Sequence, residues 1–296
     1  MSQLISQARA LVTGGNKLSS TTNALTVDLE EYFTVQALDN RVPRKRWSNQ
    51  PLRCDRQVKT LLDLFDKHNV SATFFTLGWV AERHPELIRE VHARGHEVAA
   101  HSYWHKLVFE MTPKDFRLDL IQVRDLLQEL TGQSVTGYRA PTYSITKDSL
   151  WAHEILAEEG FLYSSSIFPI HHDRYGISDY PRFPHQIEVN GRQLWEFPMT
   201  TFSFAGKNLP VSGGGYMRLL PARSVASALA SINKREKQPA IIYLHPWEID
   251  DNIPKFKQGF LQDFRGYIGI NKMLSKLEYL LKTLHFARVD TVLGLS

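Results

Sequence analysis

From Ala24 onward, short apolar runs rich in β-branched residues alternate with longer stretches in which apolar residues recur every three or four positions. This alternation is typical of strands joined by helices in a parallel sheet. It predicts strands at 24–28, 72–77, 97–100, 135–139, 163–165, 194–197 and 240–245, and helices at 58–69, 86–94, 113–131, 149–160, 221–237 and 272–284. Seven or so strand–helix units without the glycine fingerprint of a dinucleotide-binding fold favour a (β/α) barrel over an open doubly wound sheet.

The clearest helix signals lie at residues 112–132. Thr112 can cap the helix, a proline follows at the first helical position, and Gly132 can end the last turn. The helical period places Leu118, Ile121 and Leu130 on the apolar face.

The glycine run 213–215 has neither the spacing nor the lysine of a phosphate-binding loop. Glycine is required where the backbone takes unusual angles or where another chain segment packs closely. We therefore expect a loop of that kind and no phosphate site.

Charge and length narrow the class of protein. The 296 residues suffice for a sizeable core, and the net charge of +4 is scattered along the chain. The densest basic run, 41–46, is too short for a nucleic-acid or membrane patch, so no nucleic-acid partner is expected. No apolar run reaches about 18 residues, which predicts no transmembrane segment.

Cysteine usage and the N-terminus bear on the compartment. Cys54 is the single cysteine, which excludes an intramolecular disulfide and a cluster of thiolates around a metal. Residues 1–22 lack the pattern of a signal peptide, because Arg9 interrupts the short apolar stretch and no basic region precedes it. We expect a cytoplasmic protein, with a periplasmic location less favoured.

Two histidines four residues apart follow the expected strand 97–100. On one turn of helix, His101 and His105 would share a face and could share a metal ion. A second pair, His92 and His96, is different, because Gly95 is expected to end a helix between them. The first pair is therefore the candidate, at a strand end, where barrel enzymes place their sites.

Further polar residues follow three other strands. Asp28 and Glu30, two apart on an extended chain, point the same way and can supply the carboxylate that a two-histidine metal site needs. Arg139 can hold a carboxylate in place, and His245 ends the last clear strand among aromatic residues. Polar residues of this kind at the ends of four strands indicate one shared site.

In their order along the chain, these motifs resemble those of polysaccharide deacetylases with a NodB homology domain, carbohydrate esterase family 4. The acidic run at 28–31, H-S-Y-W-H at 101–105, R-A-P-T-Y at 139–143 and Y-L-H at 243–245 carry the resemblance. G-G-G-Y-M-R-L-L-P and H-P-W-E-I-D resemble the subgroup found with exopolysaccharide and PEP-CTERM/exosortase loci. The resemblance implies a distorted (β/α) barrel of about seven strands over 23–296, after a tail at 1–22 and with a C-terminal helical extension at 246–296.

The resemblance also implies metal-dependent removal of N-acetyl groups from amino sugars of a bacterial polysaccharide. The ion is expected to be Zn²⁺, with Co²⁺, Mn²⁺ or Ni²⁺ as alternatives. Carried over to this sequence, the ligands are Glu30, His101 and His105. Asp28 is the general base, Arg139 orients it, the backbone N–H of Tyr143 helps to hold the oxyanion, and His245 is the general acid. Trp104, Trp195 and Trp247 are candidate sugar platforms, and Trp195 and Glu196 lie near the place of a degenerate fourth motif.

The first motif departs from the usual family pattern of two adjacent aspartates. Here Leu29 stands between the acids and the second acid is Glu30, so the roles of Asp28 and Glu30 could be exchanged. Two alternatives remain open at this point. One is a hydrolase of a small cyclic amide or imide, allantoinase-like, on the same fold. The other is an inactive carbohydrate-binding scaffold.

Overall fold

A computed structural model describes Lys17 and residues 19–172, 174–256 and 266–296. The sheet strands are β1 (Thr22–Leu29), β2 (Thr73–Thr76), β3 (Glu97–Ala100), β4 (Gly137–Tyr138), β5 (Tyr163–Ser164), β6 (His185–Val189), β7 (Arg192–Glu196), β10 (Ile241–Leu244) and β11 (His285–Ala287). A separate hairpin is formed by β8 (Thr201–Phe204) and β9 (Lys207–Pro210). The helices are α2 (Cys54–His68), α3 (Gly78–Arg83), α4 (Pro85–Ala93), α5 (Pro113–Thr131), α6 (Trp151–Glu158), α7 (Gly214–Leu219), α8 (Ala222–Ser231), α10 (Ile270–Thr283) and α11 (Val289–Val292).

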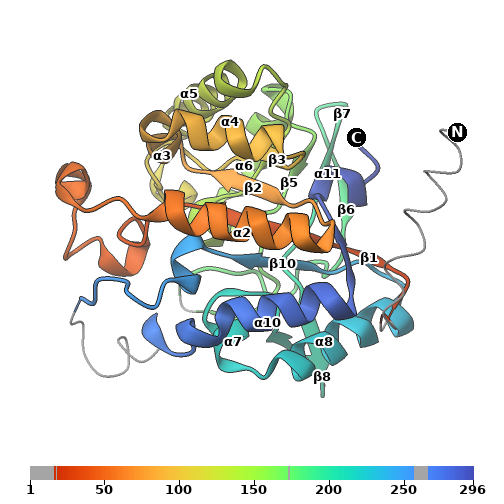
Figure 1. The fold of residues 1–296 in the computed structure, drawn as a ribbon. Helices are drawn as coiled ribbons and strands as arrows, with labels where there is room; N and C mark the ends of the chain where they lie inside the picture. The colour runs from red at the N-terminus through yellow and green to blue at the C-terminus, as the bar shows by residue number, and fades with distance from the viewer. Residues whose placement is uncertain (1–16, 18, 173, 257–265) are drawn as a thin grey trace, which may run out of the picture.

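The strands form one curved sheet in the order β10-β1-β2-β3-β4-β5-β7-β6, with helices packed around it (Figure 1). The seven strands from β10 to β7 are parallel, and β6 joins β7 as an antiparallel hairpin. Within the described residues, no ladder joins β10 to β6, so the barrel stays open there. The predicted distorted barrel is confirmed, and all seven expected strands are present.

The parallel sheet separates two apolar clusters. Along β1, Leu25, Val27 and Leu29 pack outward against the surrounding helices, while Ala24 packs inward with Phe75 and other residues of the barrel interior. Successive side chains of a strand face opposite sides of the sheet. The inward set of β1 is therefore Ala24, Thr26, Asp28 and, just past the strand end, Glu30.

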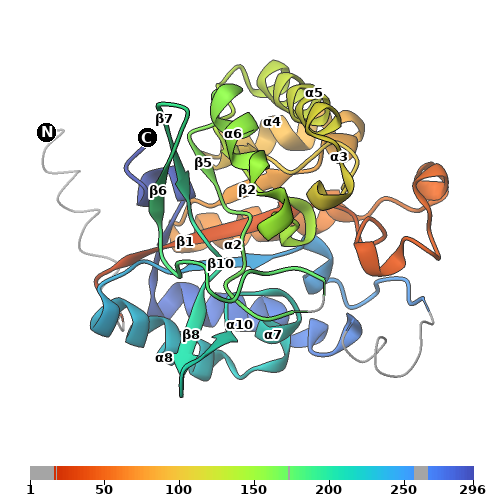
Figure 2. The ribbon, with the colours of Figure 1, turned by 180° about the vertical axis from the view of Figure 1, so that it is seen from behind.

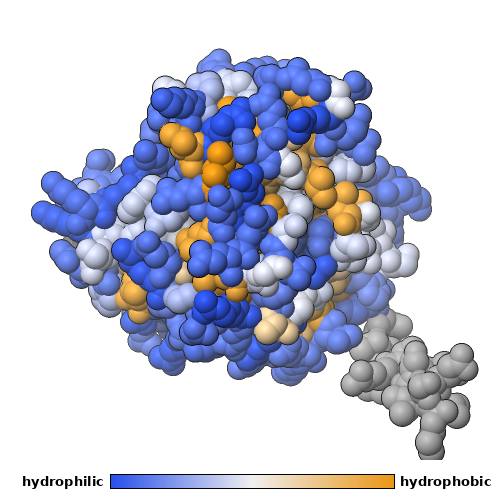
Figure 3. Space-filling model, turned by 90° about the horizontal axis from the view of Figure 1, so that it is seen from above, coloured by the Kyte–Doolittle hydropathy of each residue, from blue (hydrophilic) through white to orange (hydrophobic). Residues whose placement is uncertain are grey.

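Helix α5 begins as its signals predict but turns a different face to the core. The Thr112 hydroxyl accepts the Asp115 N–H at 3.1 Å, and Gly132 ends the helix at φ 67°. Leu118, however, is 58% exposed, so its place on the apolar face was wrong; the buried residues are Phe116, Asp119, Leu120, Val123 and Leu127. Leu130 packs against the core as predicted, but the fully buried residues of the helix are ones that the pattern did not select. The space-filling view shows hydrophobic side chains in small patches between hydrophilic ones (Figure 3).

The C-terminal segment is more than a helical extension. After α10, β11 pairs in parallel with the start of β1, from Thr22↔His285 to Ala24↔Ala287, and α11 follows. Val289 and Phe75 belong to the same interior cluster. The segment therefore completes the sheet and covers part of the barrel interior.

The glycine run meets close packing, as expected. A Cβ on Gly213 would lie 2.2 Å from the Tyr243 carbonyl oxygen, and Gly214 has φ +54° beside the Tyr243 hydroxyl. Gly214 and Gly215 open helix α7, so only part of the run is a loop.

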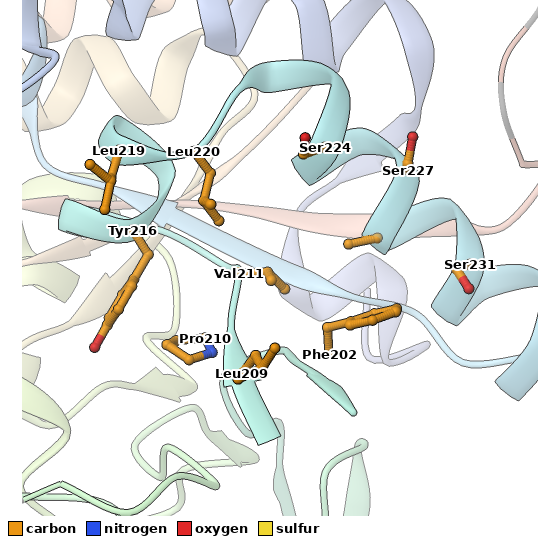
Figure 4. A pocket seen from close by; sticks show the side chains of 11 residues that line it. Phe202, Leu209, Pro210, Val211, Tyr216, Leu219, Leu220, Ser224, Ser227 and Ser231 are labelled. Carbon is orange, nitrogen blue, oxygen red and sulfur yellow. The ribbon is translucent and has the colours of Figure 1, made fainter. Parts of the chain in front are cut away.

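The β8–β9 hairpin lies beside helices α7 and α8 (Figure 2). An apolar pocket of about 640 Å³ lies between them (Figure 4). Phe202, Leu209 and Val211 line one side of it, and Tyr216 and Leu220 line the other. None of its lining residues is a predicted site residue.

Among the described residues, no helix combines the length and hydropathy that a membrane crossing requires.

Candidate functional site

Both acids of the first motif enter the barrel at the C-terminal end of β1. Asp28 is 3% exposed and Glu30 is 1% exposed. Leu29, between them, packs outward in the cluster under the helices. The inserted leucine thus keeps the alternation of the strand and lets both carboxylates face the interior side of the sheet.

Glu30, His101 and His105 bring one ligand atom each to a common point. These three atoms lie within 4.8 Å of one another, and His105 Nε2 is 3.0 Å from Glu30 Oε2. The two imidazole centroids are 5.6 Å apart. Of the 12 histidines, the predicted pair is therefore placed together beside the predicted acid.

The segment from His101 to His105 is a loop, so the expected helical turn was wrong. Ser102 and His105 have φ values of 63° and 53°, and Thr142 and Tyr143 of the next motif have 55° and 54°. Left-handed backbone at non-glycine residues costs about 1 kcal/mol or more and is found at functional sites. Two loops that carry predicted site residues are held in this conformation.

The surroundings of this cluster fit a divalent metal ion. The backbone carbonyl of Arg139 accepts a hydrogen bond from His101 Nδ1 at 2.8 Å, which leaves the Nε2 lone pair free for an ion. Burial, reinforced by neighbouring His105, lowers the pKa of His101 to about 3, so that this imidazole is neutral, as a ligand must be. One carboxylate and two imidazoles are a common donor set for zinc.

Arg139 lies at the centre of the barrel and holds Asp28. Its Nη1 donates to Asp28 Oδ1 at 2.6 Å and to Thr26 Oγ1 at 2.8 Å, while Nε and Nη2 donate to the carbonyl and hydroxyl of Ser165. The guanidinium also lies 4.0 Å from the Phe75 ring centroid. With these donors engaged, Arg139 fixes the orientation of the Asp28 carboxylate.

His245 follows β10 and faces both acids. Its Nε2 is 3.9 Å from Asp28 Oδ2 and 3.5 Å from Glu30 Oε1, and its Nδ1 is 3.2 Å from Glu248 Oε2. Burial by itself lowers the pKa of His245. The hydrogen bond and negative charge of Glu248, together with the charges of Glu30 and Asp28, outweigh burial and raise the pKa of His245 to about 9. The imidazole is thus held in its protonated form at neutral pH.

Glu248 is a site residue that the sequence reasoning did not assign. It is fully buried, and Arg218 Nε donates to its Oε1 at 2.6 Å. Burial disfavours its charge, but His245 and Arg218 outweigh that effect and lower the pKa of Glu248 to about 2. The i, i+3 spacing from His245, across Pro246, was the available signal, because such a spacing allows a reciprocal cap.

Tyr143 lies beside the Asp28–Arg139 pair. The Arg139 guanidinium is 5.8 Å from its ring centroid, and its backbone N–H donates to the Ala140 carbonyl at 3.1 Å. An oxyanion could therefore accept this N–H only by sharing it with the Ala140 carbonyl or by displacing that carbonyl.

Two of the three tryptophans lie near the histidines. Trp247 stacks on His245, with centroids 5.1 Å apart and planes at 19°. Trp104 lies between His101 and His105 in the sequence and is half-buried. Its ring centroid is 6.4 Å from that of Trp47.

Trp195 and Glu196 are not brought to this cluster. Trp195 pairs with Tyr163 of β5 and packs against the interior cluster, one residue before the end of β7. Glu196 faces outward and accepts hydrogen bonds from the N–H groups of Ser166 and Ile167 and from His153. These contacts explain its burial by local structure.

The other histidine pair is separated, as expected. Gly95 turns the chain at φ 83° after α4, and His96 is buried, where its Nδ1 accepts the Ala72 N–H at 3.0 Å. Burial lowers the pKa of His96 to about 4. His96 therefore has a structural role.

Two family models cover most of the described chain. Residues 50–158 match the polysaccharide deacetylase model, and residues 165–294 match a domain of unknown function, DUF3473. The first match contains the motifs of His101 and Arg139. The structure adds the acids of β1 and His245, which lie outside that match.

Curated relatives match part of the chain. A peptidoglycan deacetylase of Helicobacter pylori is 34% identical over 116 residues, which are 39% of this chain and 38% of that protein. A peptidoglycan-N-acetylglucosamine deacetylase of Bacillus cereus is 33% identical over 95 residues, which are 32% of this chain and 34% of that protein. The chain thus spans little more than a third of the length of these relatives.

Solved structures share the fold over nearly the whole chain. A probable polysaccharide deacetylase from Pseudomonas aeruginosa has a TM-score of 0.62 at 18% identity, with 94% of this chain and 91% of that chain covered. The PuuE allantoinase has a TM-score of 0.58 at 19% identity, with 94% and 90% covered. These likenesses show the fold, and the family match shows that residues 50–158 belong to a polysaccharide deacetylase domain.

Proposed function

We propose that this protein removes N-acetyl groups from amino sugars of a bacterial polysaccharide, with Zn²⁺ held by Glu30, His101 and His105. The observation that carries the proposal is the meeting of this ligand triad with His245 and the Asp28–Arg139 pair at the C-terminal ends of parallel strands. The substrate class is supported by the curated relatives, which are named as peptidoglycan deacetylases. An exopolysaccharide as the substrate stays a prediction from the resemblance alone.

Amide hydrolysis is difficult because the carbonyl is a weak electrophile and the amine is a poor leaving group. Glu30, His101 and His105 would hold a divalent ion, which when bound would polarise the carbonyl and lower the pKa of a water molecule to about 7. The remaining steps are proton transfers and orientation, which the side chains of this protein can supply.

Asp28 takes a proton from the attacking water, whose oxygen then bonds to the carbonyl carbon. Arg139 keeps the Asp28 carboxylate aimed for this transfer through its 2.6 Å contact. The backbone N–H of Tyr143 is the candidate donor to the oxyanion. His245, protonated through Glu248, gives its Nε2 proton to the nitrogen as the C–N bond breaks. The products are acetate and a free amino sugar.

Aromatic side chains around His245 and His105 are candidate sugar platforms. Trp247 and Trp104 lie beside the cluster, whereas Trp195 would have to act from the barrel interior. The first two are therefore the stronger candidates.

Acetate release from N-acetylated glycans, measured with zinc-loaded protein, tests the proposal. We expect turnover, loss of bound metal and of activity in His101→Ala, and no change in His92→Ala, whose imidazole lies outside the site. Turnover that persists in His101→Ala, or protein that binds no divalent metal, would refute the proposal.

The allantoinase likeness shows that the fold alone does not choose between amide substrates. The same assays should therefore include allantoin and cyclic imides beside chito-oligosaccharides. Hydrolysis confined to the cyclic substrates would overturn the sugar assignment and keep the metal site. Glycan binding without turnover at any metal loading would indicate an inactive scaffold.

A further inference from the structure

A second group of metal-ligand side chains lies next to the first along the chain. Glu31, Cys54 and His84 offer one ligand atom each, and these atoms lie within 4.8 Å of one another. They come from three segments: the residue after Glu30, the first residue of α2, and the junction between α3 and α4.

Helix capping accounts for one of the two oxygens of the Glu31 carboxylate. Its Oε1 accepts the backbone N–H groups of Arg53 at 2.7 Å and Cys54 at 3.0 Å. Helix α2 has no side-chain cap from Arg53, so Glu31 satisfies two free donors at the start of the helix. This role requires a single oxygen and neither the thiol nor the imidazole.

Two buried polar atoms in this group remain unexplained. Glu31 Oε2 and His84 Nε2 are both buried and have no nitrogen or oxygen hydrogen-bond partner among the described residues, and the Cys54 thiol lies beside the Glu31 carboxylate. Glu31 is 1% exposed, and so is Cys54. Leaving a buried polar atom unpaired is unfavourable, so two such atoms beside a buried thiol point to a missing ligand.

The backbone of His84 is held in place by the two helices that it joins. His84 ends α3, where its N–H donates to the Val80 carbonyl at 2.9 Å, and Pro85 opens α4 directly after it. The position of His84 is therefore fixed from both sides.

We propose that Glu31, Cys54 and His84 bind one Zn²⁺ as a second, structural metal site. A thiolate, an imidazole and a carboxylate are all established zinc ligands, and water can take the fourth position. On binding, Cys54 releases its thiol proton to solvent and the sulfur bonds to the ion. The ion would tie the end of β1, just beyond Glu30, to the N-terminus of α2 and to the α3–α4 junction.

Cobalt substitution distinguishes the two sites. Cys54 is the only thiol in the chain, so a thiolate-to-cobalt charge-transfer band reports on this site and on no other. We expect two Co²⁺ per chain and the band in the unchanged protein. His101→Ala should lose one ion and keep the band, whereas Cys54→Ser should lose one ion and the band.

Two further variants test the imidazole. His84→Gln should weaken cobalt binding at the thiolate site by at least about tenfold, while His92→Gln, on α4, should leave the band and the affinity unchanged. The absence of the band in the unchanged protein, or two tightly bound ions in Cys54→Ser, would overturn the proposal. If Cys54→Ser does not fold, the band and its loss on adding Zn²⁺ to the unchanged protein decide the question.

Discussion

Glu248 Oε2 contacts His245 twice, at 3.2 Å from the ring Nδ1 and at 3.0 Å from the backbone N–H that donates to it. One carboxylate oxygen thus fixes the ring and its proton together. In the proposed reaction His245 acts as an acid, so activity requires the protonated form. Activity should then fall as pH rises through about 9, the pKa to which Glu248 and the two acids of β1 raise this group.

Replacing Glu248 by Gln should move that alkaline limit to lower pH. The amide removes the largest contribution that raises the pKa of His245, so kcat should fall about tenfold at pH 8 and much less at pH 6. The measurement is kcat for acetate release against pH. Glu110→Gln, at an exposed position, is the control and should keep the original profile. An alkaline limit unchanged in Glu248→Gln would contradict the role given to Glu248.

Replacing Arg139 by Met should destabilise the protein by about 3 kcal/mol, because Asp28 stays buried without its counter-ion. Urea unfolding of metal-free protein measures the loss. The double variant Asp28→Asn/Arg139→Met removes the buried charge and should recover most of it. A double variant as unstable as the single one would show that the charge pair is not the cause.

Gly213→Ala should cost about 1–3 kcal/mol of unfolding free energy through overpacking. The added Cβ would lie 2.2 Å from the Tyr243 carbonyl oxygen, which is backbone and cannot turn aside. Tyr243 lies two residues before His245, so turnover should fall as well. Gly266→Ala, where nothing lies within 4 Å, should be nearly neutral in the same denaturation assay.

Thr112→Ala should lower the stability by about 1 kcal/mol, because the Asp115 N–H loses its cap. Thermal unfolding provides the readout. Thr60→Ala, at an exposed position inside α2, is the matched control, and an equal effect there would refute the capping argument.

The strand pattern predicted the barrel because buried parallel strands leave a plain signature of short apolar runs. The face of α5 was harder, since Leu118 and Leu120 are equally apolar and only the packing partners decide which is buried. Strand β11 is three residues long and pairs with a segment more than 260 positions away, which no local pattern records.

At the site, the sequence indicated the ligands but not the backbone that presents them. His105 reaches Glu30 through left-handed backbone at Ser102 and at His105 itself, a conformation that local residue preferences do not predict. Glu248 and Arg218 acquire a role only because α7 packs beside the end of β10.

The pairing of β1 has a consequence for how the chain folds. Two of its three neighbours, β10 and β11, lie about 215 to 265 residues further along the chain. Contacts of such long range slow folding, and a growing chain exposes unpaired strand edges until they form. The strand that carries Asp28 and leads into Glu30 therefore keeps the edge away from β2 unpaired until β10 is in place, and we expect the amide protons on that edge to be among the last to gain protection from hydrogen exchange during refolding.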